Sequence, residues 1–261
     1  MRVHSITTSK LTYARLFALA AMSLLIVLIV PFLGEGLVGF LENHTLNLGI
    51  LYAIIVGFIM SIVTNRRQTL ENNVHLELNK IRRIYHLSLH LKKTNASLTG
   101  WYEDVRAALR IYLTRFKDAR FLAYAGGDKQ FRRVTYALYG LPAVEKEYNG
   151  DLYGALLDAA ASATEAREAV HAALDPVIGR FQWFALLLVT FSFCMSFAAM
   201  TPTSPLERAL STTFIFTLFF VLDLLYEYDR PNEIMQNHLA ALYINDLDDA
   251  EGFLKKIIRK R

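Results

Sequence analysis

The sequence predicts an all-α polytopic membrane protein, with four transmembrane helices in two hairpins and a helical cytoplasmic insert between them. Of its 261 residues, 54% are hydrophobic and only 20% are charged, and the mean hydropathy is positive. This balance is too apolar for an average soluble domain and too charged for a chain buried entirely in lipid. In addition, four stretches approach the ~20 apolar residues that a helix needs to cross a bilayer core of roughly 30 Å.

These stretches are expected to be helices, because backbone polar groups cannot stay unpaired in lipid. Arg2, Lys10 and Arg15 precede the first stretch and would also suit a signal peptide. That run is long, however, and has no small-residue cleavage site, so a retained span is favoured. Gly49 and Gly57 lie two turns apart on one face of the second stretch and predict close helix packing. The four stretches cover residues 16–34, 43–65, 181–206 and 209–222, the last extendable to 226.

The loops between the stretches differ strongly in charge. Residues 35–42 carry two glutamates and no Lys or Arg, and residues 201–208 carry a single cation, Arg208. The opposite ends are rich in cations, namely Arg15, Arg66, Arg67, Arg180, Arg230 and the closing "KKIIRKR". The positive-inside rule therefore predicts an inner (plasma) membrane protein with both termini in the cytoplasm. The predicted regions are 1–65, the cytoplasmic domain 66–180, the second hairpin 181–229 and the cytoplasmic tail 230–261.

The insert is expected to be helical throughout. No Pro or Gly occurs between Arg66 and Gly100, so the second span should continue into the cytoplasm as one long helix. Pro176 and Gly179 should kink the chain before the third span. Apolar residues recur at helical spacing at Leu70, Val74, Ile81, Ile84 and Leu91, and again at Leu98, Trp101, Val105, Leu109, Tyr112 and Phe116.

No motif for catalysis stands out, so the chain is not expected to be an enzyme or to need a cofactor. It has no Gly-rich phosphate loop or nucleophile elbow, and its single cysteine excludes a disulfide or a cysteine metal site. A net charge of +4 gives no reason to expect nucleic acid. His86 and His90 share a helical face and, with Glu77 or His75, could bind a metal. A surface or packing role is favoured, because the pair alone supplies only two ligands.

The C-terminal tail offers a second, weak metal candidate. Four acids lie within six residues, and oxygen clusters of this kind suit calcium. The alternative is that these acids start a helix whose basic end complements the helix dipole and lies on anionic lipid. The acids are Asp246, Asp248, Asp249 and Glu251, and the basic end is Lys255–Arg261.

The fourth stretch ends on "LLYEYDRPNE", which places acids close to the membrane. Asp223 and Glu227 lie one turn apart on one face. An ionised side chain costs about 2.5–3.5 kcal/mol at the bilayer centre and less near the interface, so such residues normally face protein, water or a permeation path. The alternative is that Asp223 is already at headgroup level and pairs with Arg230 or Arg180.

Three stretches together resemble one family. They are "LGILYAIIVGFIMSIVTNRRQTLENNV…LNKIRRIYHL", "GRFQWFALLLVTFSF" and "FVLDLLYEYDRP". Their order resembles the bacterial bestrophin-like membrane proteins of unassigned function, which are distantly related to bestrophin anion channels. The resemblance covers roughly residues 40–231, and its motif is Glu227, Asp229, Arg230 and Pro231. Relatives usually carry Phe after that proline, whereas this chain has Asn232, and no Asn-Pro-Phe occurs near the second span.

The resemblance implies a homo-oligomeric channel, a pentamer by analogy, with the second spans around the axis and the acidic motif at its inner mouth. Rings of apolar side chains can gate by dewetting, although each candidate could also face lipid or the core. Ion sign stays open. The acids favour cations, whereas the kinship and the insert's 18 Lys and Arg against 13 Asp and Glu favour anions. The rival hypothesis is a membrane-anchored sensor or scaffold whose insert recruits a cytoplasmic partner. The pore-lining candidates are Leu51, Ile55, Phe58 and Ile62.

Overall fold

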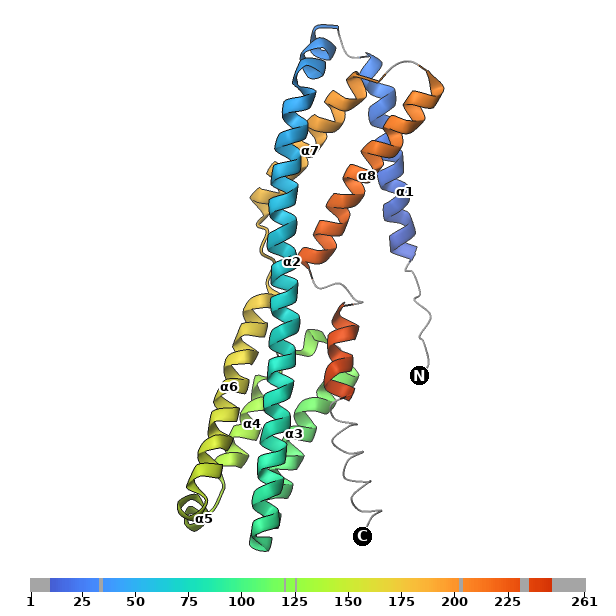
Figure 1. Cartoon of the computed structure of the whole chain (residues 1–261). Helices are drawn as coiled ribbons and strands as arrows, with labels where there is room; N and C mark the ends of the chain where they lie inside the picture. Colours follow the sequence, from blue (N-terminus) through green and yellow to red (C-terminus); the bar gives the residue numbers. More distant parts are fainter. Residues whose placement is uncertain are drawn as a thin grey trace. The chain divides into compact units, whose positions relative to one another are not determined.

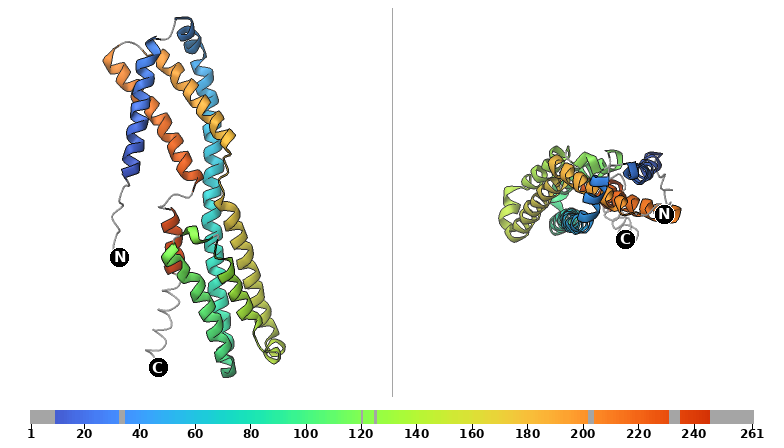
Figure 2. Two further views of the ribbon diagram at one scale, coloured as in Figure 1. Left: turned by 180° about the vertical axis from the view of Figure 1, so that it is seen from behind. Right: turned by 90° about the horizontal axis from the view of Figure 1, so that it is seen from above.

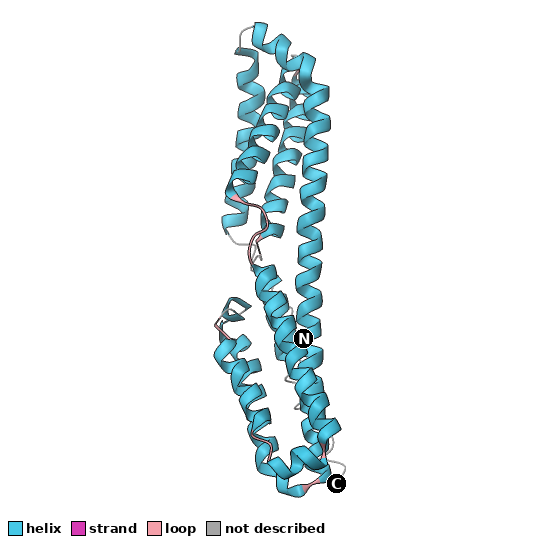
Figure 3. Cartoon of the chain, turned by 90° about the vertical axis from the view of Figure 1, so that its left-hand side faces the viewer, coloured by secondary structure: helices cyan, strands magenta, loops and turns pink. Residues whose placement is uncertain are grey.

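The chain is seen in a computed structural model that describes residues 10–32, 35–119, 121–124, 126–201, 204–230 and 235–245. Within these ranges every regular element is a helix and no strand occurs (Figure 3). The all-α class predicted from the sequence is therefore confirmed.

The helices follow one another along the chain with short connections (Figure 1). A further helical segment covers residues 235–245. The labelled elements are α1 (Lys10–Ile29), η1 (Val30–Phe32), α2 (Glu35–Thr94), η2 (Ala96–Leu98), α3 (Thr99–Ala119), η3 (Phe121–Tyr124), α4 (Asp128–Tyr139), α5 (Ala143–Tyr148), α6 (Gly150–Leu174), α7 (Arg180–Ala199) and α8 (Pro205–Asp229).

The chain divides into two compact units. The membrane unit comprises residues 1–64 and 176–229, and the insert unit comprises residues 65–175 and 230–261. The 60-residue helix α2 contributes to both, which confirms that the second span continues without a break. The helical run of α6 ends at Leu174 and α7 begins at Arg180, so the chain is interrupted where Pro176 and Gly179 predict it.

In the described part of the chain, three helices are long and apolar enough to cross a membrane: the helix over Val38–Thr94, α7 and α8. The apolar part of α1, Tyr13–Ile29, is shorter, because η1 takes over at Val30. The sequence predicts four spans, and length and composition therefore support three of them. Helix α8 continues to Asp229, so the acidic end of "LLYEYDRPNE" belongs to the helix rather than to a following loop.

In the membrane unit, α1, α7 and α8 pack on one another around an apolar core (Figure 2). One face of α2 meets α7 and α8. There the Thr45 hydroxyl donates to the carbonyl of Ser196 at 3.2 Å, and the Tyr52 hydroxyl donates to that of Leu218 at 3.4 Å. A Cβ on Gly49 would lie 3.0 Å from the ring of Phe193, so any larger residue there would have to displace this ring. At Gly57 no atom of this chain lies within 4 Å of a Cβ position, so a packing role there stays a prediction.

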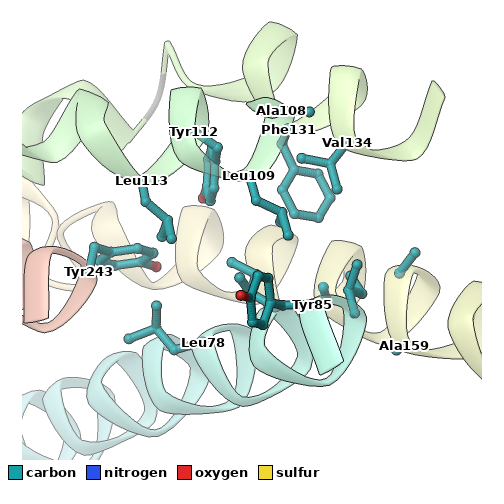
Figure 4. Packing of buried hydrophobic residues seen from close by; sticks show 14 of the residues in the cluster. Leu78, Tyr85, Ala108, Leu109, Tyr112, Leu113, Phe131, Val134, Ala159 and Tyr243 are labelled. Carbon is teal, nitrogen blue, oxygen red and sulfur yellow. The ribbon is translucent and has the colours of Figure 1, made fainter. Parts of the chain in front are cut away.

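The core of the insert unit is formed by α2, α3, α4, α6 and the 235–245 segment. All the apolar positions predicted for the two inward faces, from Leu70 to Phe116, are buried. Aromatic rings fill one end of this core. The ring of Tyr243 stacks on that of Phe116 with centroids 4.0 Å apart, and Tyr112 lies edge-on to Phe131. Figure 4 shows Tyr112 of α3 and Tyr243 of the 235–245 segment pointing into this interior beside α2.

Candidate functional site

The acidic end of α8 is the first candidate region. Asp223 is partly buried on this helix. The Glu227 carboxylate lies 3.8 Å from the Arg15 guanidinium of α1, and the two side chains are 36% and 43% exposed. An ion pair at this exposure contributes at most about 1 kcal/mol. Glu227 is thus held loosely and stays accessible to water or ions.

Asp229 has a different environment from its neighbours in the motif. Its side chain is fully buried, and its Oδ1 accepts the backbone N–H groups of Val177 at 3.0 Å and Ile178 at 3.3 Å. These donors precede the first turn of α7, where backbone N–H groups have no partner within a helix. Asp229 therefore fastens the end of α8 to the segment that leads into α7.

Several predicted residues lie outside the described part of the chain. They are Pro231, the acids Asp246, Asp248, Asp249 and Glu251, and the basic end Lys255–Arg261. Arg230, the last described residue of the motif, is exposed. The possible calcium site and the contact with anionic lipid stay predictions.

The histidines of α2 do not form a metal site. His75, His86 and His90 are exposed, whereas Glu77 is fully buried in the core. Among the described residues no group of three or more His, Cys, Asp or Glu is placed to hold a metal ion. His86 and His90 are exposed, as the favoured surface interpretation expects.

The pore-lining candidates form a continuous stripe on α2, which we call the α2 stripe. Its members Leu51, Ile55, Phe58 and Ile62 are spaced four, three and four residues apart, and the stripe lies about a third of a turn from the Gly49 and Tyr52 face. Phe58 is 67% exposed and Leu51 is 45% exposed.

An open apolar pocket of about 300 Å³ adjoins the α2 stripe. Three members of the stripe line it, together with residues just before α7 and in its first turn. The lining residues are Ile54, Ile55, Phe58, Ile59, Ile62, Val177, Ile178 and Gln182. Asp229 holds the backbone of 177 and 178, so the acid of the α8 motif positions one wall of this pocket.

Helix α2 is the least buried of the apolar helices. Only 11% of its most apolar window is buried inside the chain, against 33% for α7 and for α8. Large side chains such as Leu46, Ile50, Ile54 and Phe58 are exposed along it. Contiguous apolar surface of this kind is normally covered by lipid or by another protein surface.

A buried polar cluster occupies the core of the insert unit, and we call it the Glu77 cluster. The Glu77 carboxylate accepts hydrogen bonds from the hydroxyls of Tyr112, of Tyr124 at 2.5 Å and of Tyr243 at 2.7 Å. Arg167 lies 3.9 Å from it and is 4% exposed. Residues of α2, α3, η3, α6 and the 235–245 segment thus meet at one carboxylate.

Arg167 connects the cluster to the surface. It donates from Nη1 to the Tyr112 hydroxyl and from Nη2 to the carbonyl of Tyr124 at 2.8 Å. Nη2 also donates to Asp128 at 2.9 Å, and His171 lies 3.4 Å from the same oxygen. The guanidinium stacks over the Tyr124 ring at 4.4 Å. A buried guanidinium is therefore almost completely surrounded by acceptors and aromatic faces.

The surroundings act on the pKa values of this cluster in opposite directions. Burial raises the pKa of Glu77, while the three tyrosine hydroxyls and Arg167 oppose that rise. The hydrogen bond from Arg167 lowers the pKa of the partly exposed Asp128. Burial and the nearby Glu77 raise the pKa of Tyr112 and Tyr243, so both phenols remain donors. The protonation of Glu77 is therefore coupled to the hydroxyl groups and the guanidinium that surround its carboxylate.

A signal for this cluster was present in the sequence. Glu77 occupies a core position in the series Val74, Glu77 and Ile81, and Arg167 lies between Ala163 and Val170 on the inward side of α6. A charged residue at an apolar phase of a helix indicates a buried partner, because an unpaired charge there would be costly.

Fold and site together define a helical membrane protein with an exposed apolar helix and a polar-cored helical insert. A family model described as the Bestrophin-like domain matches residues 45–232. Because this match covers most of the chain, the protein belongs to the bestrophin-like family. The family suggests an ion channel and not an enzyme. No curated protein and no solved structure matches the chain.

Proposed function

We propose that the protein is a homo-oligomeric bestrophin-like ion channel of the inner membrane, with the α2 stripe lining its pore. The observation that carries the proposal is the exposure of α2 within a chain of this family. The chain's four apolar helices leave little room for an aqueous pore of their own, so several copies would surround the axis, five by family analogy. Both termini and the insert would lie in the cytoplasm.

Rings of Leu51, Ile55, Phe58 and Ile62 would form an apolar constriction. Such a constriction conducts when wetted and closes by dewetting. Asp223 and Glu227 would lie near the inner mouth, where exposed carboxylates attract cations. The excess of Lys and Arg in the insert would attract anions, and together with the kinship it favours anions slightly.

The test is conduction by the purified full chain in planar lipid bilayers, with its mass measured in detergent. We expect an oligomer and single-channel currents whose reversal potential in a salt gradient reports the ion sign. Glu227→Gln should change the current amplitude, because it removes a charge at the mouth. A monomer that leaves bilayers silent contradicts the proposal.

A membrane-anchored scaffold is the second candidate. The observation in its favour is an exposed basic and aromatic face on α4, which suits a partner protein. This candidate predicts silent bilayers together with capture of a cytoplasmic partner that depends on α4.

A further inference from the structure

Helix α4 presents a face that its own chain leaves uncovered. The helix buries Phe131, Val134 and Leu138, and its opposite side carries five exposed residues. We call this side the α4 basic face, and its members are Lys129, Arg132, Arg133, Tyr136 and Tyr139. Tyr136 is 68% exposed and Tyr139 is 54% exposed.

The composition of the α4 basic face is that of an interface. None of its three cations forms an ion pair among the described residues. Arg and Tyr are enriched at the centres of protein interfaces, where their planar groups lose little conformational freedom. Three cations beside two exposed phenols therefore suit an acidic protein surface.

Such an acidic surface exists on the chain itself, along α6. Asp151, Asp158 and Glu165 recur every seven residues and lie on one exposed side of that helix, with Glu168 beside them. We call these four residues the α6 acidic face. In the described part of the chain none of them pairs with a cation, and the one Lys or Arg of α6, Arg167, is buried on the other side.

The two faces do not pair within the described part of one chain. Helices α4 and α6 each turn their buried side toward the core of the insert unit, as Arg167 shows by reaching Asp128 at the start of α4. Their exposed sides therefore point away from that core, and no ion pair joins the two faces among the described residues. At 1.5 Å per residue, the basic face is about 15 Å long and the acids from 151 to 165 extend over about 21 Å. The α4 basic face can therefore lie along the α6 acidic face over its whole length.

We propose that the α4 basic face of one copy docks on the α6 acidic face of a second copy of this chain. The contact uses two different surfaces, so it is head-to-tail, and contacts of this kind close into rings when the rotation permits. The inference rests on the homo-oligomer of the proposed function and names the surfaces that join its inserts. Opposite charges on the two faces would select the register and suppress like-charged pairings.

The first test is charge reversal in the full chain, with mass measured by light scattering in detergent. Arg132→Glu with Arg133→Glu should raise the dissociation constant of the oligomer at least tenfold, and so should Asp158→Lys with Glu165→Lys. Combining all four substitutions should restore assembly, because the charges are exchanged across the contact. Asp104→Lys reverses an exposed acid of α3 outside both faces and should leave the mass unchanged.

The second test is cross-linking between differently tagged chains. One chain carries Arg132→Cys and the other Glu165→Cys, and the only native cysteine, Cys194, is buried. Oxidation should yield a disulfide that joins the two differently tagged chains. Chains with Asp104→Cys and Glu165→Cys should form no such disulfide.

The outcomes separate this contact from the channel itself. A stable oligomer that ignores both reversals overturns the docking contact and leaves the channel proposal standing. A wild-type chain that is monomeric overturns both. Loss of binding to phosphatidylserine vesicles in the Arg132→Glu and Arg133→Glu variant, at unchanged mass, assigns the α4 face to lipid and overturns the contact.

Discussion

Two buried hydroxyls of the membrane unit and one buried acid of the insert unit find their hydrogen-bond partners in different ways. In the membrane unit the buried hydroxyls of Ser23 and Thr190 donate to carbonyls four residues earlier in their own helices. In the insert unit the buried Glu77 accepts hydrogen bonds from hydroxyls of three other elements. A hydroxyl satisfied within its own helix leaves that helix free to pack by shape. A buried carboxylate can only accept hydrogen bonds and needs several donors, so it holds segments that are distant in the sequence together in one core.

Asp229 is an acid of the membrane unit that behaves like Glu77. It holds two backbone N–H groups 51 and 52 residues away in the chain, much as Glu77 holds its tyrosines. The comparison therefore predicts that two acids, Glu77 and Asp229, stabilise the fold, whereas the exposed Glu227 serves function alone.

The largest effect is expected for Glu77→Ala. This change leaves three phenol hydroxyls and one side of Arg167 without their buried acceptor, and breaking a buried pair costs about 3–5 kcal/mol. Hydrogen exchange of the full chain in detergent should show loss of protection in α3 and the 235–245 segment. Asp104→Ala, at an exposed acid, should change stability by less than about 0.5 kcal/mol. A Glu77→Ala protein as protected as the control would refute the role of the cluster.

Asp229→Ala should come next. It removes the acceptor of two backbone N–H groups, and a hydrogen bond to a charged group contributes about 1.5–3 kcal/mol. Asp229→Asn keeps an oxygen at the same place and should cost clearly less. Thermal denaturation ranks the two variants, and exchange at the amides of Val177 and Ile178 locates the change. Equal losses for both substitutions would count against the capping role.

The pH dependence of stability sharpens the comparison further. Burial raises the pKa of Glu77 in the folded chain above its ordinary value of 4.5, so the folded state holds this proton more tightly than the unfolded state. Its contribution to stability is full below about pH 4.5 and is lost as the pH rises through the folded pKa. Glu77→Gln carries no titrating group, so wild type should lose stability relative to this variant over that window. If the melting temperatures of wild type and Glu77→Gln changed in parallel with pH across this window, the raised pKa of Glu77 would be contradicted.

The smallest structural effect is expected for Glu227→Gln. Its ion pair with Arg15 is exposed, so the melting temperature should change by no more than a degree or two, equivalent to well under 1 kcal/mol. Currents in bilayers should nevertheless change. A strongly destabilised Glu227→Gln variant would remove the distinction between Glu227 and Asp229.

Local features of the sequence predict most of the fold. The absence of Pro and Gly after Arg66 predicts the length of α2, and helical spacing predicts the inward faces of α2 and α3. The end of α1 is missed, because apolar composition beyond Ile29 does not reveal a change to η1. The cluster partners of Glu77 come from positions 112, 124, 167 and 243, and such long-range contacts leave no periodic signal.

The same holds for the candidate site. The spacing of Leu51, Ile55, Phe58 and Ile62 predicts one stripe, and the structure describes it as exposed or partly exposed. The family motif draws attention to Asp229 without revealing its function. Only tertiary packing shows that the Asp229 carboxylate accepts a hydrogen bond from the backbone N–H of Val177. The Glu227 carboxylate, two residues earlier, lies instead in a partly exposed ion pair with Arg15.

Thiol block of single-channel currents at position 58 tests the central claim, that α2 lines the pore, most directly. In Phe58→Cys, a charged water-soluble methanethiosulfonate reagent should abolish the current, because the side chain would face the conducting water. Ile50→Cys, on another face of α2, should conduct unchanged under the same reagent, and Cys194 is buried. Block at Ile50→Cys with full conduction at Phe58→Cys would contradict the account.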